Sequence, residues 1–97
     1  MRQQILIVDD SEMNREILSD MLDNDFRILE AENGEECLQL IDQYGTGISA
    51  ILLDIVMPKM DGFEVLNVME RKHLIEDIPV IMISSEDSDV YVRRAYE

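Results

Sequence analysis

Short continuous runs of apolar residues recur along the chain, and each run ends in polar side chains. Residues 5–8, 48–53 and 78–83 form three such runs. A continuous apolar run of this length, bounded by turn residues, is typical of a strand buried on both faces of a sheet. The run at residues 26–31 is interrupted by two charged side chains, which predicts a less buried strand at an edge of the sheet.

Apolar residues at helical spacing follow each of these four runs, and each helical pattern begins at a residue suited to cap a helix. The expected caps are Ser11, Asn33, Asp61, and either Asp87 or Ser88. The expected apolar faces are, in chain order, Met13, Ile17, Leu18, Met21 and Leu22; Cys37, Leu38, Leu40 and Ile41; Phe63, Val65, Leu66, Val68 and Met69; and Val92, Ala95 and Tyr96.

Strand and helix patterns therefore alternate along the whole chain. This alternation predicts right-handed crossovers and a mostly parallel sheet with helices on both faces. We expect one α/β domain over residues 1–97, built as a doubly wound parallel sheet of four strand–helix units. A chain of 97 residues is too short for a closed barrel of eight such units.

The composition narrows the class of function. With 22 acidic against 8 basic residues, the formal net charge is −14, which argues against nucleic-acid binding or docking on an anionic membrane by this domain. The single cysteine, Cys37, cannot form an internal disulfide. No apolar stretch approaches the length of a membrane span, and the N-terminus lacks the pattern of a signal peptide, so we expect a cytoplasmic protein.

Polar side chains stand where three of the predicted strands end: Asp9 and Asp10, Asp54, and Ser84. Because parallel strands end at the same edge of a sheet, these side chains converge if their strands are neighbours. Two carboxylates ~4 Å apart repel each other by roughly 4 kcal/mol at an effective dielectric constant near 20. A Mg²⁺ ion held by carboxylates, a backbone carbonyl and water would remove this repulsion. The alternative is a carboxyl group that stays protonated or points into solvent.

The four glycines match neither of the glycine-rich nucleotide fingerprints. A site of acids, a hydroxyl and Mg²⁺ without a nucleotide loop suggests phosphoryl transfer to or from an aspartate.

Three sequence blocks carry a family resemblance. Residues 8–11 read VDDS, residues 53–62 read LDIVMPKMDG and residues 79–84 read PVIMIS. In their order and spacing these blocks resemble the receiver domain of bacterial two-component response regulators, and the resemblance covers the whole chain. It implies a flavodoxin-like fold, with the strand order 2-1-3-4 for the four units present and a fifth unit missing.

The resemblance also implies roles for individual residues. Asp54 matches the phospho-acceptor, Asp9 and Asp10 match the acid pair that binds Mg²⁺, Val56 matches the residue whose backbone carbonyl contacts the metal, and Ser84 matches the switch hydroxyl. The implied partner is a sensor histidine kinase or a phosphotransfer protein, and a small phosphodonor can replace it. Such a domain catalyses its own modification and is not a conventional enzyme. The resemblance leaves room for a C-terminal output domain.

The chain departs from the family at its end. The family's fifth strand, which ends in a lysine, and its fifth helix have no counterpart here, so we expect an incomplete receiver domain. Phosphoryl transfer to Asp54 is then expected to be weakened, or uncoupled from its signal. The fourth strand, residues 78–83, is expected to form an open edge that invites self-association.

Two alternatives remain open from the sequence. One is a phosphorylation-impaired receiver that works as a dimerisation or interaction module. The other is a phosphatase similar to the haloacid dehalogenases, which also use a strand-end aspartate and Mg²⁺. That family has a second acid two positions after its nucleophile, where this chain has Val56, and this disfavours the phosphatase.

Overall fold

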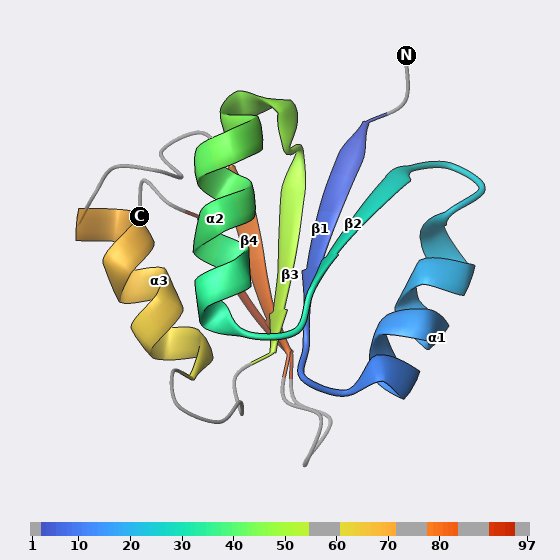
Figure 1. Cartoon of the computed structure of the whole chain (residues 1–97), viewed down its shortest axis with the longest axis horizontal. Helices are drawn as coiled ribbons and strands as arrows, with labels where there is room; N and C mark the ends of the chain where they lie inside the picture. Colours follow the sequence, from blue (N-terminus) through green and yellow to red (C-terminus); the bar gives the residue numbers. More distant parts are fainter. Residues whose placement is uncertain (1–2, 55–60, 72–77, 84–89, 95–97) are drawn as a thin grey trace.

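The computed structural model describes residues 3–54, 61–71, 78–83 and 90–94. Figure 1 shows the arrangement of the helices and strands. In chain order they are β1 (Gln4–Val8), α1 (Glu12–Leu22), β2 (Arg27–Ala31), α2 (Gly34–Tyr44), the 3₁₀ turn η1 (Gly45–Gly47), β3 (Ala50–Asp54), α3 (Gly62–Arg71), β4 (Pro79–Ile83) and β5 (Val90–Arg94).

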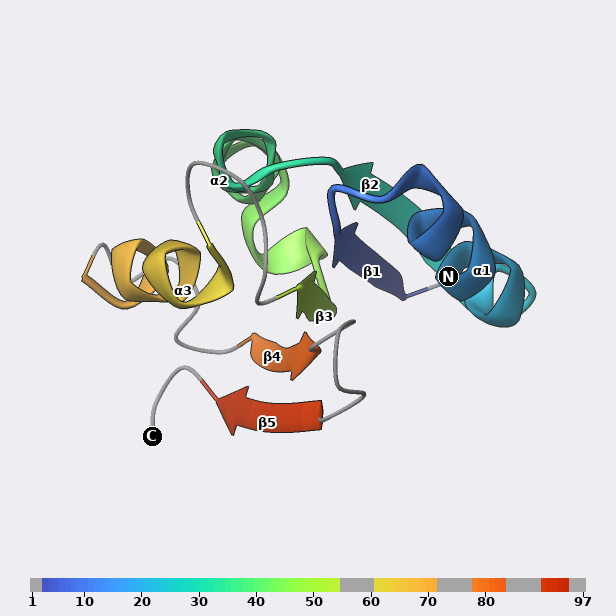
Figure 2. The same ribbon diagram turned by 90° about the horizontal axis from the view of Figure 1, so that it is seen from below.

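The strands form one sheet in the order β2-β1-β3-β4-β5. The ladders from β2 to β1, β1 to β3 and β3 to β4 are all parallel. Helix α1 lies on one face of the sheet, and α2 and α3 lie on the other, as seen in Figure 2. The expected doubly wound α/β fold, with the parallel order 2-1-3-4, is therefore confirmed.

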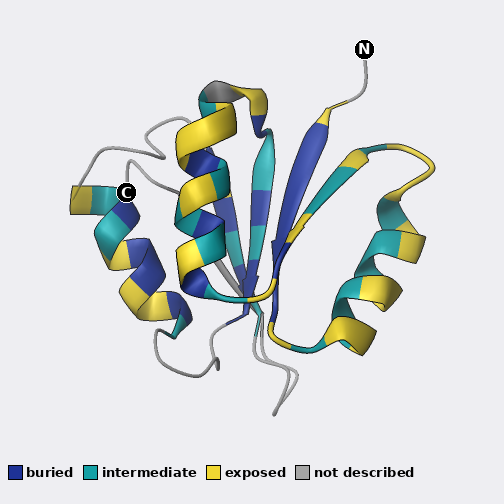
Figure 3. Ribbon diagram, viewed as in Figure 1, coloured by how far each residue is buried: buried dark blue, intermediate teal, exposed yellow. Residues whose placement is uncertain are grey.

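The core lies between the central strands and the helices α2 and α3. All five residues of β1 are buried, whereas Arg27 and Glu30 of β2 are exposed, as expected for an edge strand. Figure 3 shows this contrast along the sheet. Burial of aliphatic side chains is the main term that stabilises such a core. Its members are Leu6, Val8, Ala31, Cys37, Ile41, Ile48, Ile51, Leu53, Val65, Leu66, Met69, Ile78, Val80 and Met82.

The described helices begin at the caps that the sequence pattern predicted. A side-chain oxygen of Ser11, Asn33 and Asp61 accepts a hydrogen bond from the main-chain N–H three positions later, at 3.3, 2.9 and 2.9 Å respectively. These bonds satisfy donors that have no partner within the helix. Because α1 and α2 follow the strands β1 and β2 closely, the caps Ser11 and Asn33 also fix how the chain leaves the carboxyl edge of the sheet.

The apolar face predicted for α1 is only partly correct. Leu18 and Leu22 are partly buried, but Met13, Ile17 and Met21 are 69%, 51% and 70% exposed. Helix α1 contacts the strands β1 and β2, and the three exposed side chains lie on the part of the helix that does not face them. A similar correction applies to α3, where Phe63 is 50% exposed.

The last predicted helix is wrong where the structure describes it. Residues 90–94, which include Val92, form β5, and this strand pairs with β4 in the antiparallel direction. Two valines and a tyrosine at positions 90–92 favour an extended chain, and β4 offers a row of main-chain donors and acceptors for pairing. The expected open edge at β4 is therefore also wrong, and self-association through it loses its basis.

Several predicted positions fall outside the described residues. They are Val56, Ser84, the caps Asp87 and Ser88, and Ala95 and Tyr96. Within the described part of the chain, no helix has the length and apolar character needed to span a membrane.

Candidate functional site

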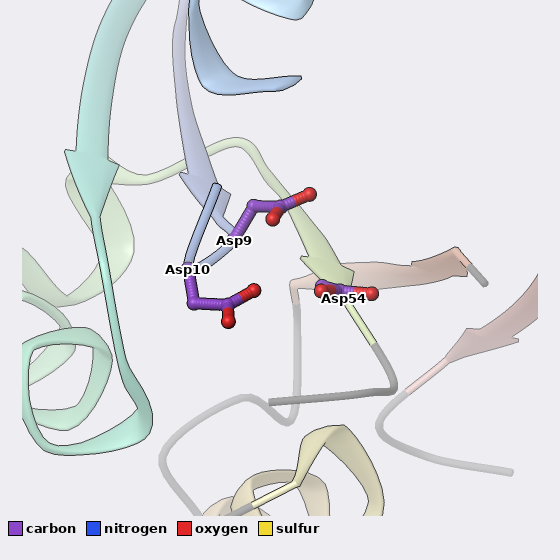
Figure 4. Close-up of side chains that lie close together, drawn as sticks. All are labelled: Asp9, Asp10 and Asp54. Atoms are coloured by element: carbon purple, nitrogen blue, oxygen red, sulfur yellow. The ribbon is translucent and has the colours of Figure 1, made fainter. Parts of the chain in front are cut away.

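Three carboxylates meet at the carboxyl edge of the sheet. In the β1–β3 ladder Val8 lies opposite Leu53, and the next residues along the two strands are Asp9 and Asp54. Asp10 follows Asp9 at the start of the turn into α1. One carboxylate oxygen from each aspartate lies within 4.8 Å of the others, as Figure 4 illustrates. The convergence expected for these three acids is therefore present.

The burial of the three aspartates differs. Asp9 is 6% and Asp54 is 3% exposed, whereas Asp10 is exposed. Two buried carboxylates and a third that is exposed make the cluster accessible to solvent on the side of Asp10. Buried carboxylates at this separation repel each other strongly unless a cation or hydrogen-bond donors compensate their charge.

The turn from β1 into α1 is held by two hydrogen bonds of Asp9 and by the helix cap at Ser11. The main-chain N–H of Asp9 donates to the carbonyl of Ala31 on β2 at 3.1 Å. Its Oδ1 atom accepts from the N–H of Ser11 at 2.8 Å, and Ser11 in turn caps α1. This geometry fixes both the main chain and the carboxylate of Asp9. It also determines where Asp10 enters the site.

Arg15 adds a contact that the sequence analysis missed. Its Nη1 atom donates to the main-chain carbonyl of Asp9 at 2.6 Å, and its Nε atom lies 3.1 Å from Oε1 of Glu30 on β2. A signal for this residue does exist, because Arg15 is the only basic residue between positions 9 and 26. Its inward orientation, however, depends on how α1 is placed on the sheet.

The donor set of the cluster fits a magnesium ion. Carboxylate oxygens are the hard ligands that Mg²⁺ prefers. Asp54 is the last residue of β3, and Asp9 directly follows β1, so the packed sheet holds both of them. A divalent cation would also relieve the mutual repulsion of the three acids. The residues available to hold it are Asp9, Asp10 and Asp54. The expected contributions of Val56 and Ser84 concern residues outside the described part of the chain.

Cys37 has no part in this site. It is fully buried in α2, as expected for a core residue, and burial raises the pKa of its thiol to about 12 from 9.0. A thiol that stays protonated is a poor nucleophile and a poor metal ligand.

The comparisons with known proteins identify the family. The family model of the response regulator receiver domain matches residues 5–97. The chain therefore belongs to the response regulator receiver domains, the signalling switches of two-component systems. This result confirms the resemblance seen in the three sequence blocks, and it sets aside the haloacid dehalogenase alternative.

Individual relatives agree with this assignment. The chain is 35% identical over 96 residues to the chemotaxis protein CheY of Halobacterium salinarum, covering 98% of this chain and 77% of that protein. It is 42% identical over 84 residues to a probable cyclic di-GMP phosphodiesterase of Vibrio cholerae, covering 87% of this chain but only 19% of the relative. The chain thus spans about a fifth of this longer relative.

A solved structure shares the fold. The complex of CheX with CheY, BeF3 and Mg²⁺ from Borrelia burgdorferi contains a chain that superposes with a TM-score of 0.75 at 36% identity, covering 89% of this chain and 64% of that chain.

Proposed function

We propose that this domain is a phosphorylatable receiver in which Asp54 accepts the phosphoryl group. Asp9 and Asp10 bind Mg²⁺ together with Asp54 and the backbone carbonyl of Val56, and the hydroxyl of Ser84 hydrogen-bonds to the new phosphoryl group. The observation that carries this proposal is the position of Asp54, which is 3% exposed with a carboxylate oxygen within 4.8 Å of those of Asp9 and Asp10.

The proposed reaction is a single transfer. A carboxylate oxygen of Asp54 forms a bond to phosphorus, and the bond from phosphorus to the donor's imidazole nitrogen breaks. The electron pair of that bond stays on the imidazole, which takes a proton from solvent. Strand β3 holds the nucleophile in place, so little motion of Asp54 is needed to reach an in-line approach. Mg²⁺, when bound, neutralises charge on the phosphoryl oxygens during transfer.

Two further observations support this assignment. A protein similar to this chain has been solved with BeF3 and Mg²⁺. In the β3–β4 ladder Asp54 lies opposite Ile83, the residue that precedes Ser84 in the sequence. Because β3 and β4 are parallel, they end at the same edge, which suits a role for Ser84 beside Asp54.

The proposed partner is a sensor histidine kinase or a phosphotransfer protein in the cytoplasm. The response is carried by whatever binds the phosphorylated domain, or by an output domain in the same polypeptide. The second possibility is suggested by the longer phosphodiesterase relative, of which the chain covers 19%.

The test is phosphorylation by acetyl phosphate in the presence of Mg²⁺, followed by intact-protein mass spectrometry. We expect one phosphoryl adduct on the wild-type chain and none on Asp54→Asn. Asp42→Asn is the matched control, because it removes the same charge from an exposed position on α2 and is expected to keep the adduct. An adduct on Asp54→Asn would overturn the assignment of the acceptor. A wild-type chain that takes no phosphoryl group would favour the interaction module instead.

A further inference from the structure

One peptide group of the acid cluster is held by a side chain from another element. The carbonyl of Asp9 belongs to the peptide that joins Asp9 to Asp10, and it accepts a hydrogen bond of 2.6 Å from Nη1 of Arg15 on α1. Because a peptide group is planar, the direction of this carbonyl sets the direction in which the chain continues to Asp10. Arg15 therefore acts on the exposed acid of the cluster through its backbone.

Arg15 reaches this carbonyl from a well-defined position. Its side chain is 12% exposed, and its Nε atom is bound to Glu30 at 3.1 Å. A guanidinium presents its donors in a fixed planar fork, so a bond at one nitrogen orients the others. Glu30 on β2 thus aims Arg15 at the carbonyl of Asp9. A lysine at position 15 could donate to either acceptor, but it could not span both with the same geometry.

The charge of Glu30 has a second effect. A lone arginine beside the cluster would repel a divalent cation and so lower its affinity. The carboxylate of Glu30, in contact with the guanidinium, offsets this positive charge. Arg15 can therefore orient the Asp9–Asp10 peptide while the ion pair as a whole adds little positive charge beside the proposed Mg²⁺ site.

We infer that Arg15 is a positioning residue for the acid cluster, which sets the Mg²⁺ affinity by fixing the peptide between Asp9 and Asp10. This inference rests on the proposed Mg²⁺ role of the cluster. The competing explanation is that Arg15 and Glu30 form a structural salt bridge with no effect on the metal. The two explanations differ in which variants change Mg²⁺ affinity in protein that remains folded.

The experiment compares Mg²⁺ dissociation constants of the wild type, Arg15→Met and Glu30→Gln, measured by titration well below each thermal midpoint. Arg15→Met keeps an unbranched side chain and removes every donor, and we expect about tenfold weaker binding, the lower end for loss of a group that orients metal ligands. Glu30→Gln removes the negative charge but keeps an amide oxygen that can accept from Nε of Arg15, so the guanidinium stays aimed at the carbonyl of Asp9. We expect the uncompensated charge of Arg15 to weaken Mg²⁺ binding by no more than about threefold, because solvent screens charges near the surface. Equal losses in both variants, or no loss in Arg15→Met, would overturn the inference.

A metal-free readout accompanies the titration. Backbone amide chemical shifts of Asp10 and Ser11 are sensitive to the conformation and hydrogen bonding of this turn, and we expect them to move much more in Arg15→Met than in Glu30→Gln. Should Arg15→Met fail to fold, Arg15→Lys takes its place. It keeps the charge and loses the fork, so a weakening beyond that of Glu30→Gln supports the inference and an affinity like the wild type's contradicts it.

The outcomes separate the two proposals. A wild-type chain that binds no Mg²⁺ contradicts the proposed function and this inference together. Wild-type binding with unaltered affinity in the Arg15 variants contradicts the inference alone.

Discussion

Val8 of β1 lies directly opposite Leu53 of β3, and each is followed by an aspartate. The meeting of the acids at this edge is thus a consequence of strand register. Side chains alternate between the two faces of a sheet. A shift of one residue in this ladder would therefore turn the side chains of one strand to the opposite face, and Asp54 would no longer lie beside Asp9. The apolar side chains that bury both strands therefore also hold the acids in position, and the stability of the fold and the geometry of the site depend on the same contacts.

The crowding of carboxylates in this cluster leads to a prediction about stability. In the absence of Mg²⁺, we expect Asp10→Asn to raise the free energy of unfolding by about 1 kcal/mol, because it removes one charge from a group whose oxygens lie within 4.8 Å of one another. Asp10 is exposed, and solvent screening keeps the effect at this small size. Urea unfolding with and without Mg²⁺ measures it.

Mg²⁺ should make the wild type more stable than Asp10→Asn, the reverse of their order without the ion. A ligand that binds the folded state alone raises its stability, so Mg²⁺ should raise the thermal midpoint of the wild type and have little effect on Asp10→Asn. Asp42→Asn on α2 serves as the control, since it changes the net charge equally away from the cluster. An equal response to Mg²⁺ in all three proteins would show that the ion binds elsewhere.

The acids of the site could be predicted from the sequence, whereas the residue that orients them could not. Asp9 and Asp54 end apolar runs, and parallel strands bring such ends together whatever the details of packing. Arg15 lies in a helix whose apolar residues, Met13 and Ile17 among them, suggested a different inward face. Which residues of α1 turn to the sheet depends on how the helix packs against strands that are distant in the sequence, and a periodic pattern does not contain that information.

The secondary structure of residues 90–94 also could not be predicted from the local sequence alone. Residues 90–94 follow residues suited to cap a helix, which favoured a helix, but they include β-branched and aromatic side chains, which favour a strand. In the structure these residues form a strand, which pairs with β4 in an antiparallel ladder that runs from the pair Pro79 and Arg94 to the pair Ile83 and Val90. The main-chain partners that β4 offers therefore favour the strand over the helix. Local propensity was ambiguous, and the neighbouring strand determined the result.

This pairing predicts an effect of removing the segment. A chain shortened to residues 1–89 would leave β4 at the edge of the sheet with its main-chain groups unpaired. Such an edge is a template for another copy, so we expect the shortened chain to elute as larger species in size-exclusion chromatography at concentrations where the 1–97 chain elutes as a monomer. Identical elution of both chains would mean that β5 does not protect the edge.

The unequal exposure of the methionines predicts the order of their oxidation. Met13 and Met21 on α1 are 69% and 70% exposed, whereas Met69 and Met82 are 0% and 1% exposed. Dilute hydrogen peroxide should convert the first two to sulfoxide much faster than the last two, because oxidation follows solvent access. Peptide mapping by mass spectrometry over a time course measures the rates. Comparable rates would contradict the placement of α1, and denaturant should remove the difference.

Cys37 predicts a loss of stability at alkaline pH. Burial raises the pKa of its thiol from 9.0 to about 12, and the side chain is 0% exposed. Above pH 9 the thiol of the unfolded chain loses its proton while the folded thiol keeps it, so the unfolded state is favoured increasingly as the pH rises towards 12. The free energy of unfolding is unaffected by this thiol below pH 9. Between pH 9 and 12 the thiol lowers the free energy of unfolding by at most about 4 kcal/mol.

The measurement is the free energy of unfolding between pH 8 and 11, compared with Cys37→Ala. The variant is less stable throughout, because it leaves a small cavity in the core. Its decline with pH should be shallower than that of the wild type, since tyrosines and lysines titrate in both proteins but the thiol titrates in only one. Parallel declines would show that Cys37 is not held protonated. Slow alkylation by iodoacetamide at pH 9, accelerated by urea, would confirm the same burial independently.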